Sequence, residues 1–371
     1  MTKLTLTSGP GTTAEIFSGP RVFKKMNDFF AGRLSGADQI FILVDENTRR
    51  CCLPVLANRV SLLQDSEIIE IQSGEANKSL VSAENLWKIL QEKNASRHAI
   101  LVNLGGGVIS DLGGFVASTF KRGIRFINIP TTLIGMSDAA IGGKTGINLD
   151  NIKNQVGSFQ NPEAVFIYPG FLKSLDTYHL LSGLAEIVKT ALVADPVLWE
   201  RLLAVSLHEL MDIPFDEPLW EDLLGRSVEN KCRIAEMDFR DRNIRGILNF
   251  GHTIGHAFES LSLSAKGTPL SHGHAIALGI LCESRLSTKK TGLSAKDMEA
   301  ISRLVLGEFE YIPLKGKDIA YMVSCMGHDK KMKGREIRMT LLEKPGKAVT
   351  GVKCDESEIR EALDYYGSIK C

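Results

Sequence analysis

Residues 99–107, AILVNLGGG, place an apolar run directly before three consecutive glycines. A short apolar run that ends in glycine is typical of a buried strand that turns at once into the next element. Three further runs have a similar character, at 39–44 (QIFILV), 68–71 and 126–129. Stretches with helical spacing, such as 82–92, separate them, and this alternation predicts βαβ units on a parallel sheet. Such sheets bind ligands at the carboxyl ends of their strands.

The second half of the chain has a different periodicity. Apolar residues recur every three or four positions in four stretches, at 181–192, 219–234, 254–263 and 275–286. This spacing predicts a mostly α-helical second half. A chain of 371 residues is also too long for one core of ordinary size. We therefore expect two domains, an α/β domain at 1–173 and a helical domain at 174–371, separated near Gly170 to Ser174.

The composition argues against several classes of protein. Lysine plus arginine equals aspartate plus glutamate, 44 each, whereas general binders of nucleic acid or acidic membranes carry a basic surplus. The seven cysteines form no CxxC pair, which predicts neither a disulfide framework nor a thiolate zinc site. No apolar run approaches the roughly 20 residues that span a bilayer, and no signal sequence opens the chain. We expect a cytoplasmic protein with a small-molecule ligand and neither nucleic acid nor membrane as a partner.

Four of the eight histidines fall within 23 positions. His252 and His256 lie four apart in GHTIGHAFE, which places them on one face of a helix, and His272 and His274 follow in SHGHA. Two helical histidines can bind one metal ion when the fold supplies a third ligand. Such a pair is also common as a purely structural feature, and the histidines alone leave both interpretations open. The glutamate of the HExxH motif is absent, which argues against a zincin protease.

Glu186 and Lys189 share a helical face in the apolar segment SGLAEIVK, residues 182–189. The simplest interpretation is a local ion pair that stabilises the helix by a few tenths of a kcal/mol. A carboxylate on a largely apolar helix is costly to bury, and binding a cation would offset its charge. On these residues alone the ion pair is the favoured interpretation.

The glycine-rich segments suit ligands that carry phosphate. Glycines 105–107 let the backbone approach a ligand and offer N–H groups to phosphate oxygens, although the GxGxxG pattern is absent. Asp45, after an early strand, could accept a hydrogen bond from a ribose or cap the next helix. The segment GGKT at 142–145 is not a Walker motif, because Asp138 stands where that motif requires glycine.

Several basic and amide side chains would suit a phosphorylated, carboxylated substrate, since arginine binds carboxylates bidentately and lysine neutralises phosphate. Each of them taken alone is most simply a solvated charge. These residues are Arg122, Lys144, Lys153, Asn154, Lys231, Arg245, Asn249, Lys330 and Lys331.

Taken as a set, these stretches closely resemble the 3-dehydroquinate synthase family. The resemblance rests on GGGVISDLGGFVASTFKRG, IPTTL, GGKTGIN, KNQVGSF, SGLAEIVK, ILNFGHTIGHAFE and HDKK, in this order, and covers residues 40–342. It implies a Rossmann-like N-terminal domain and a helical C-terminal domain. It also implies the conversion of 3-deoxy-D-arabino-heptulosonate 7-phosphate to 3-dehydroquinate and phosphate, a step of the shikimate pathway. NAD, recycled within each turnover, and a divalent metal ion, zinc or cobalt, would be the cofactors.

The resemblance also assigns roles to individual residues. The implied metal ligands are Glu186, His252 and His272. The implied NAD-binding residues are Asp45, Glu75, Lys78, Gly106, Gly107, Val108, Asp111, Thr131, Thr132, Lys144 and Lys153. The implied catalytic residues are His256, Lys144, Lys189, Lys231, Arg245 and Asn249. The implied substrate-binding residues are Arg122, Asp138, Lys153, Asn154, Lys330 and Lys331. Arg122 matches an arginine that reaches a neighbouring subunit's phosphate site in this family, which implies a homodimer.

The chain departs from the family pattern at a few positions. His274 stands where the family usually has glutamate, Ser110 replaces a usual glycine, and Ala139 and Ala140 replace two serines. His274 is therefore a candidate for perturbing the surroundings of the metal. None of these changes removes an implied metal ligand.

Three alternative functions remain to be weighed. Sister cyclases that act on sedoheptulose 7-phosphate or glucose phosphate lack a substrate carboxylate, so Lys231, Arg245 and Asn249 together favour the dehydroquinate synthase reaction. A metal-dependent polyol dehydrogenase would release NADH. The third alternative is a non-catalytic homologue, and the intact set of implied metal ligands, Glu186, His252 and His272, argues against it.

Overall fold

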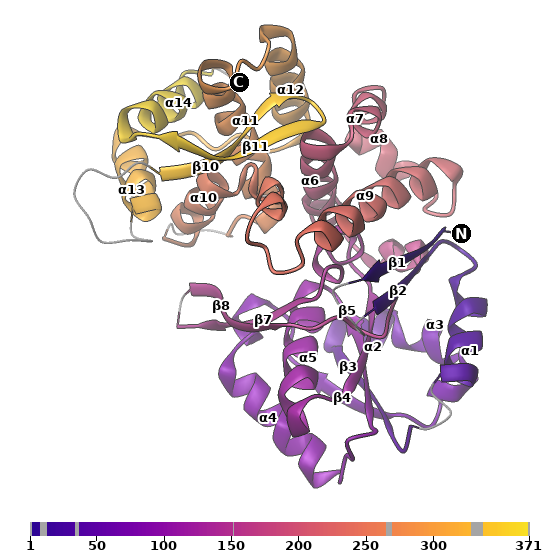
Figure 1. The fold of residues 1–371 in the computed structure, drawn as a ribbon. Coiled ribbons are helices and arrows are strands. Elements are labelled where there is room, and N and C mark those ends of the chain that lie inside the picture. The colour runs from indigo at the N-terminus through magenta and orange to yellow at the C-terminus, as the bar shows by residue number, and fades with distance from the viewer. Residues whose placement is uncertain are drawn as a thin grey trace. The chain divides into compact units, whose positions relative to one another are not determined.

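The computed structural model describes residues 2–7, 13–33, 37–150, 152–264, 269–327 and 337–369 of the chain. The chain divides into two compact units (Figure 1). The first comprises Met1–Asp176 and Pro214–Arg240, and the second comprises Thr177–Ile213 and Asp241–Cys371. Among the described residues, no helix combines the length and the apolar character that crossing a membrane would need.

A seven-stranded sheet forms the centre of the first unit. Its spatial order is β1 (Thr2–Thr7), β2 (Thr13–Ser18), β9 (Ala164–Ile167), β6 (Arg125–Pro130), β5 (Ile100–Gly105), β3 (Ile40–Asp45) and β4 (Glu67–Ile71). Only the pair β1–β2 is antiparallel, and every other neighbouring pair is parallel. The predicted parallel sheet and its four predicted strands are therefore confirmed.

Helices connect these strands as the sequence pattern predicts. The helices of the first unit are α1 (Val22–Arg33), α2 (Glu46–Cys51), α3 (Leu53–Ala57), α4 (Leu80–Glu92), α5 (Gly107–Thr119) and α9 (Pro218–Met237). An antiparallel hairpin of β7 (Lys144–Leu149) and β8 (Ile152–Phe159) forms a separate small sheet. Because α5 begins two residues after β5 ends, the glycines predicted to bind a ligand lie at the carboxyl edge of the sheet.

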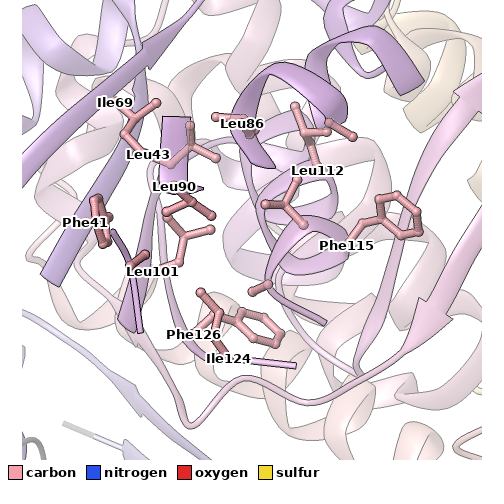
Figure 2. Close-up of a cluster of buried hydrophobic side chains, with 14 of the residues drawn as sticks. Phe41, Leu43, Ile69, Leu86, Leu90, Leu101, Leu112, Phe115, Ile124 and Phe126 are labelled. Carbon is pink, nitrogen blue, oxygen red and sulfur yellow. The ribbon is translucent and has the colours of Figure 1, made fainter. Parts of the chain in front are cut away.

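The hydrophobic core of this unit lies between the sheet and the helices α4 and α5 (Figure 2). Phe41 and Leu101 from the strands face Leu86 and Leu90 of α4, and Leu112 comes from α5. Each fully buried large apolar side chain stabilises the fold by roughly 1.5–3 kcal/mol. This packing fixes the position of α5, and with it the first turn that follows Gly106.

The second unit is mostly helical, as predicted. Its helices are α6 (Thr177–Ala194), α7 (Pro196–Leu203), α8 (Leu207–Asp212), α10 (His252–Ser264), α11 (His272–Lys290), α12 (Ala295–Glu308), α13 (Gly316–Gly327) and α14 (Glu356–Ser368). A hairpin of β10 (Ile337–Lys344) and β11 (Lys347–Cys354) packs against α11, α6 and the 3₁₀ helix Ile244–Asn249. That hairpin has no counterpart among the predicted elements.

One helix belongs to a different unit from the one that its place in the sequence suggests. Helix α9 lies beyond residue 174, yet it packs on β1 and on the π-helical turn Gly135–Ala139 of the first unit. Its buried face, which includes Trp220, Leu224 and Val228, is covered there. The compact units therefore differ from the predicted domains, 1–173 and 174–371, by this segment.

Candidate functional site

Three histidines meet in the second unit. Helix α10 begins at His252 and carries His256 one turn later, and α11 begins at His272. The ring centroids are 5.4 Å apart for His252–His256, 5.4 Å for His252–His272 and 5.7 Å for His256–His272. One ring nitrogen from each residue lies within 4.8 Å of the others. This spacing is short enough for the rings to surround a single ion.

Glycines beside these histidines explain the close approach. A Cβ atom on Gly279 of α11 would lie 2.0 Å from the carbonyl oxygen of Gly251, and one on Gly255 would lie 3.0 Å from that of Ala275. A Cβ atom on Gly273 would lie 1.9 Å from the carbonyl oxygen of Ser182 in α6. The helices α10, α11 and α6 therefore cross backbone against backbone, which only glycine permits, and the histidines next to these glycines are brought together.

Glu186 of α6 completes the cluster. Its side chain is 1% exposed, and its Oε1 lies 3.4 Å from Nε2 of His272 and 4.0 Å from Nε2 of His252. Oε1 has no hydrogen-bond partner among the described residues, whereas Oε2 forms the predicted ion pair with Lys189. A buried carboxylate oxygen that faces two imidazole nitrogens is a donor set suited to a divalent cation. The structure thus brings the predicted ligands Glu186, His252 and His272 together, and it also shows the predicted ion pair between Glu186 and Lys189.

The charge states of Glu186 and His252 suit metal binding. Burial would raise the pKa of Glu186, but Lys189 and the two histidines hold it well below its ordinary value. Burial and the positive charge of Lys189 lower the pKa of His252 well below its usual range. Glu186 is therefore an anion and His252 is neutral at neutral pH, which are the states in which these side chains bind a metal ion.

The other nitrogens of the two histidines have their own partners. Nδ1 of His252 lies 3.3 Å from the carbonyl oxygen of Phe250, and Nδ1 of His272 lies 3.7 Å from Oε2 of Glu259. Burial lowers the pKa of His272, but its contacts with the carboxylates of Glu186 and Glu259 outweigh this and raise it to about 9. Such contacts orient the rings of metal ligands. Glu259 is not among the predicted site residues, although it lies on the same helical face as His252 and His256, which was its signal in the sequence.

The predicted catalytic residues belong to both units. In the second unit, Arg245 is 1% exposed, and the same 3₁₀ helix carries the exposed Asn249. In the first unit, Lys231 of α9 forms an ion pair with Asp138. Lys330 and Lys331 lie outside the described residues.

The predicted cofactor residues gather at the carboxyl edge of the parallel sheet. Gly106 follows β5 and is the N-cap of α5, and a Cβ atom there would lie 2.9 Å from Cγ2 of Thr132. The N–H of Thr131 donates to the carbonyl oxygen of Gly105 at 3.0 Å. The ends of β5 and β6 are therefore in contact, with the first turn of α5 between them. Val108 lies in that turn, which offers its N–H groups to an anion.

A polar network joins further predicted residues of this edge. The Nζ of Lys78 donates to Oδ2 of Asp111 at 3.0 Å and to Oδ1 of Asn154 at 2.7 Å, and lies 3.3 Å from Oε1 of Glu75. Asp45 is the N-cap of α2 and accepts from the N–H of Thr48 at 2.8 Å. Asp45 was expected either to bind a ribose or to cap the next helix. In the structure it caps helix α2.

The remaining predicted residues of the first unit lie on the β7–β8 hairpin and near the surface. Lys144 begins β7, and Lys153 lies on β8. Arg122 is exposed and lines a pocket of about 500 Å³ with Ser96, Arg97, His98 and Lys121. This lining is rich in basic side chains, which suits an anion.

Two family models match residues 68–332, and solved structures match nearly the whole chain. The family model described as 3-dehydroquinate synthase N-terminal matches residues 68–182, and the one described as 3-dehydroquinate synthase C-terminal matches residues 183–332. A 3-dehydroquinate synthase of Parabacteroides distasonis is 44% identical over 89% of this chain and 91% of its own length. One of Clostridium tetani is 35% identical over 93% and 89%, respectively.

Two solved structures share the fold. A 2-deoxy-scyllo-inosose synthase complexed with carbaglucose-6-phosphate, NAD+ and Co2+ has a TM-score of 0.85 at 24% identity, over 98% of this chain and 99% of the other. ValA, a 2-epi-5-epi-valiolone synthase from Streptomyces hygroscopicus with NAD+ and Zn2+ bound, has a TM-score of 0.82 at 27% identity, over 97% and 98%. The two family models together cover most of the residues, and the chain belongs to the 3-dehydroquinate synthase family.

Proposed function

We propose that this chain is a 3-dehydroquinate synthase, a phosphorus–oxygen lyase that converts 3-deoxy-D-arabino-heptulosonate 7-phosphate to 3-dehydroquinate and phosphate. Membership of the family supports this reaction. The observation that carries the proposal is the buried Oε1 of Glu186, which faces Nε2 of both His252 and His272 without a hydrogen-bond partner among the described residues. An arrangement of this kind is costly to bury unless a cation occupies it.

Glu186, His252 and His272 would hold the metal ion, and we propose zinc or cobalt. ValA, at 27% identity, has NAD+ and Zn2+ bound, which supports both cofactors for this chain. When bound, the metal ion would polarise substrate oxygens and NAD would accept and return a hydride. The first turn of α5 and the network of Lys78 and Asp111 would bind NAD.

The side chains of the second unit fit the remaining tasks. The ring of His256 is exposed beside His252, and imidazole can exchange a proton with a substrate hydroxyl near neutral pH. Arg245 and Asn249 on one 3₁₀ helix would bind the substrate carboxylate. Lys189 carries a positive charge beside Glu186, where it would stabilise the enolate that forms when the C–H proton next to the oxidised carbon is removed.

In the first unit, lysines would bind the anionic parts of the substrate. Lys231 is 6% exposed and pairs with Asp138, so its ammonium group is held in place before substrate arrives. Lys144 and Lys153 lie on the two strands of one hairpin, β7–β8. Lysine neutralises a phosphate as a point charge, and these residues would stabilise phosphate as it leaves.

We also propose that the protein is a homodimer. The outer strand β8 carries the exposed apolar side chains of Ile152, Val156 and Phe159, which a second copy would cover. Arg122, in its basic pocket, would reach the phosphate of the partner's substrate. Sedimentation velocity should give a dimer mass, and a monomer at micromolar concentration would contradict this part of the proposal.

A cytoplasmic location completes the proposal. The six described cysteines are all free thiols, which fits a reducing compartment. The substrate is a phosphate ester of central metabolism, and the chain has no excess of basic residues to bind acidic membranes.

A sister cyclase that acts on sedoheptulose 7-phosphate is the second candidate, because a 2-epi-5-epi-valiolone synthase shares the fold and 27% of the sequence. The buried Arg245 favours the carboxylated substrate, since the planar guanidinium group of arginine binds a carboxylate bidentately. Relative activity on the two heptulose phosphates distinguishes the two functions.

The test is phosphate release from 3-deoxy-D-arabino-heptulosonate 7-phosphate, with NAD and added zinc or cobalt, in the presence and absence of a chelator. Metal-dependent release without net NADH formation is expected. Release only from sedoheptulose 7-phosphate would assign the chain to the sister cyclases. Accumulation of NADH with a polyol and no phosphate release would indicate a dehydrogenase.

A further inference from the structure

Glu283 carries a fully buried carboxyl group on the long helix α11, outside the cluster described above, and burial raises its pKa to about 8. Both of its oxygens accept hydrogen bonds from the backbone of another helix. Oε2 accepts from the N–H of Gly251 at 2.6 Å, and Oε1 accepts from the N–H of Ile254 at 3.0 Å. These donors belong to the beginning of α10, where backbone N–H groups have no partner within the helix.

The crossing of the two helices explains how Glu283 reaches this position. Gly279 of α11 lies against Gly251, the residue before α10, and against Gly255 of α10, with no room for a side chain. Glu283 follows Gly279 by four residues and therefore lies on the same face of α11. The glycine contact brings the two backbones together, and the carboxyl group one turn further on meets the first turn of α10.

The capped turn carries the metal-binding histidines. Gly251 immediately precedes His252, and Ile254 lies between His252 and His256. The first turn of a helix frays unless its N–H groups are satisfied, and side-chain caps stabilise it by roughly 0.5–2 kcal/mol. In α10 the cap comes from a neighbouring helix, so the same contact also fixes α10 against α11, which begins at His272.

We propose that Glu283 is a positioning residue that holds the first turn of α10 and thereby sets the spacing of the histidine nitrogens for the metal ion. This inference rests on the proposed function, because it assumes that the cluster of Glu186, His252 and His272 binds a metal. Glu283 itself contacts neither substrate nor cofactor in this role. It acts through the backbone at Gly251 and Ile254.

The substitution Glu283→Gln tests the role at nearly constant volume. Glutamine replaces one acceptor oxygen by an amide nitrogen, which would point a donor at a backbone N–H. We expect the affinity for Co2+ to fall at least tenfold, the scale seen when the supports of metal ligands are removed. We expect kcat at saturating metal to fall as well, with the KM for NAD unchanged.

Ser287→Ala is the matched control. Ser287 is equally buried, lies one turn further along α11, and accepts from the backbone N–H of Leu342 in β10 at 3.0 Å. Its hydroxyl donates to the backbone carbonyl oxygen of Glu283 at 2.7 Å, so the substitution leaves the carboxyl group of Glu283 in place. Its removal also leaves a buried N–H without its partner, which costs about 1–3 kcal/mol. The control should lower stability to a similar extent while leaving the affinity for Co2+ unchanged.

The experiment is a titration of the metal-free full chain with Co2+, followed by the visible absorption of the bound ion, together with urea unfolding of each variant. A wild-type chain that binds no cobalt would overturn the proposed metal site itself. Wild-type binding with an unchanged cobalt affinity in Glu283→Gln would overturn only the positioning role. Equal cobalt losses in Glu283→Gln and Ser287→Ala would also overturn it, because they would show a general effect of destabilisation.

If the Glu283→Gln variant does not fold, Glu283→Asp tests the positioning role of Glu283 instead. Aspartate keeps both acceptor oxygens but is shorter by one methylene group, so it draws the first turn of α10 toward α11. A weaker affinity for Co2+ in a folded Glu283→Asp variant is expected. An affinity equal to that of the wild type would overturn the proposal.

Discussion

The imidazole ring of His274 stacks on the phenol ring of Tyr178, with centroids 4.2 Å apart and an angle of 21° between the planes. Nδ1 of His274 is hydrogen-bonded to Oγ of Ser271 at 2.7 Å, and the N–H of Ser271 donates to the hydroxyl of Tyr178 at 2.6 Å. Burial, followed by the nearby His179, lowers the pKa of His274 to about 4, so the ring is neutral near pH 7. His274 thus contacts both Tyr178 at the start of α6 and Ser271, the residue before His272.

Replacing His274 with alanine should therefore lower the stability of the second unit. The stacked pair contributes about 0.5–1.5 kcal/mol, and the hydrogen bond to Ser271 contributes about as much. The loss in free energy of unfolding, measured in urea, should be about 1–3 kcal/mol. Tyr178→Phe keeps the stack and should cost about 1 kcal/mol. A double-mutant cycle of His274→Ala and Tyr178→Ala with no coupling energy would contradict the interpretation of the stack.

The strands, and the meeting of Glu186, His252 and His272, could be predicted from the sequence because their signals are local or belong to a recognisable motif. The apolar run at 99–104 is buried whatever its neighbours, and GHTIGHA places His252 and His256 on one helical face. Glu259 and Glu283 were not predicted because their partners come from another helix or a distant segment. Glu259 shares a helical face with His252 and His256, but that local signal does not identify His272 as its partner. No local pattern shows which carboxyl group the crossing of two helices brings to the start of α10.

The placement of α9 could not be predicted for a similar reason. Its spacing of apolar residues shows that one face is buried, but periodicity does not identify the surface that covers it. In the structure that surface is β1 together with the turn at Gly135–Ala139, both from the first half of the chain. Asp45 is a different case, because an aspartate after a strand suits two roles, and in the structure it caps helix α2.

Helices α10 and α11 cross in contact at glycines. We therefore expect two Gly→Ala substitutions, at Gly279 and at Gly307, to differ strongly in their effect on stability. A Cβ atom on Gly279 would lie 2.0 Å from the carbonyl oxygen of Gly251 and 2.6 Å from the nitrogen of Gly255. Gly279→Ala should force the helices apart and cost about 1–3 kcal/mol or more, with weaker metal binding. Gly307→Ala in α12, where nothing lies within 4 Å, should be neutral or stabilise by up to about 1 kcal/mol.

Thermal unfolding and a cobalt titration of both variants check this prediction. The two substitutions add the same methyl group to a helix, so helix propensity cancels between them. Normal stability and normal cobalt affinity in Gly279→Ala would show that the two helices do not cross at backbone distance.

Asp111 predicts a pH dependence of stability in the first unit. Burial raises its pKa to about 6, although Lys78 pulls it down. A carboxyl group with a raised pKa contributes its stability at low pH, and this contribution is lost as pH rises through the folded-state pKa. Asp111→Asn cannot ionise, so its stability relative to the wild type should increase between about pH 4 and pH 6 and then level off. Each unit of pKa difference corresponds to about 1.4 kcal/mol.

Urea unfolding of both proteins across pH 4–8 measures this difference. The opposite slope, with Asp111→Asn losing stability relative to the wild type as pH rises, would show that the pair with Lys78 outweighs the cost of burial. A constant offset would show that the pKa of Asp111 is not perturbed by folding.

His272→Ala separates metal binding from folding more cleanly than any change at Glu186. Removing the Glu186 carboxylate would leave the buried ammonium group of Lys189 without its ion-pair partner, which costs about 3–5 kcal/mol and confounds the result. His272 is 31% exposed, so its truncation should cost less stability than removal of the Glu186 carboxylate, while it removes one of the three proposed ligands. Metal content, measured by mass spectrometry of the purified chain, and phosphate release should be lost together.

His208→Ala is the control. His208 is an exposed histidine of α8 in the same unit, and its variant should keep both metal content and phosphate release. Full metal content in His272→Ala would exclude this residue as a ligand, and retained metal without activity would move its role from binding the ion to the reaction itself.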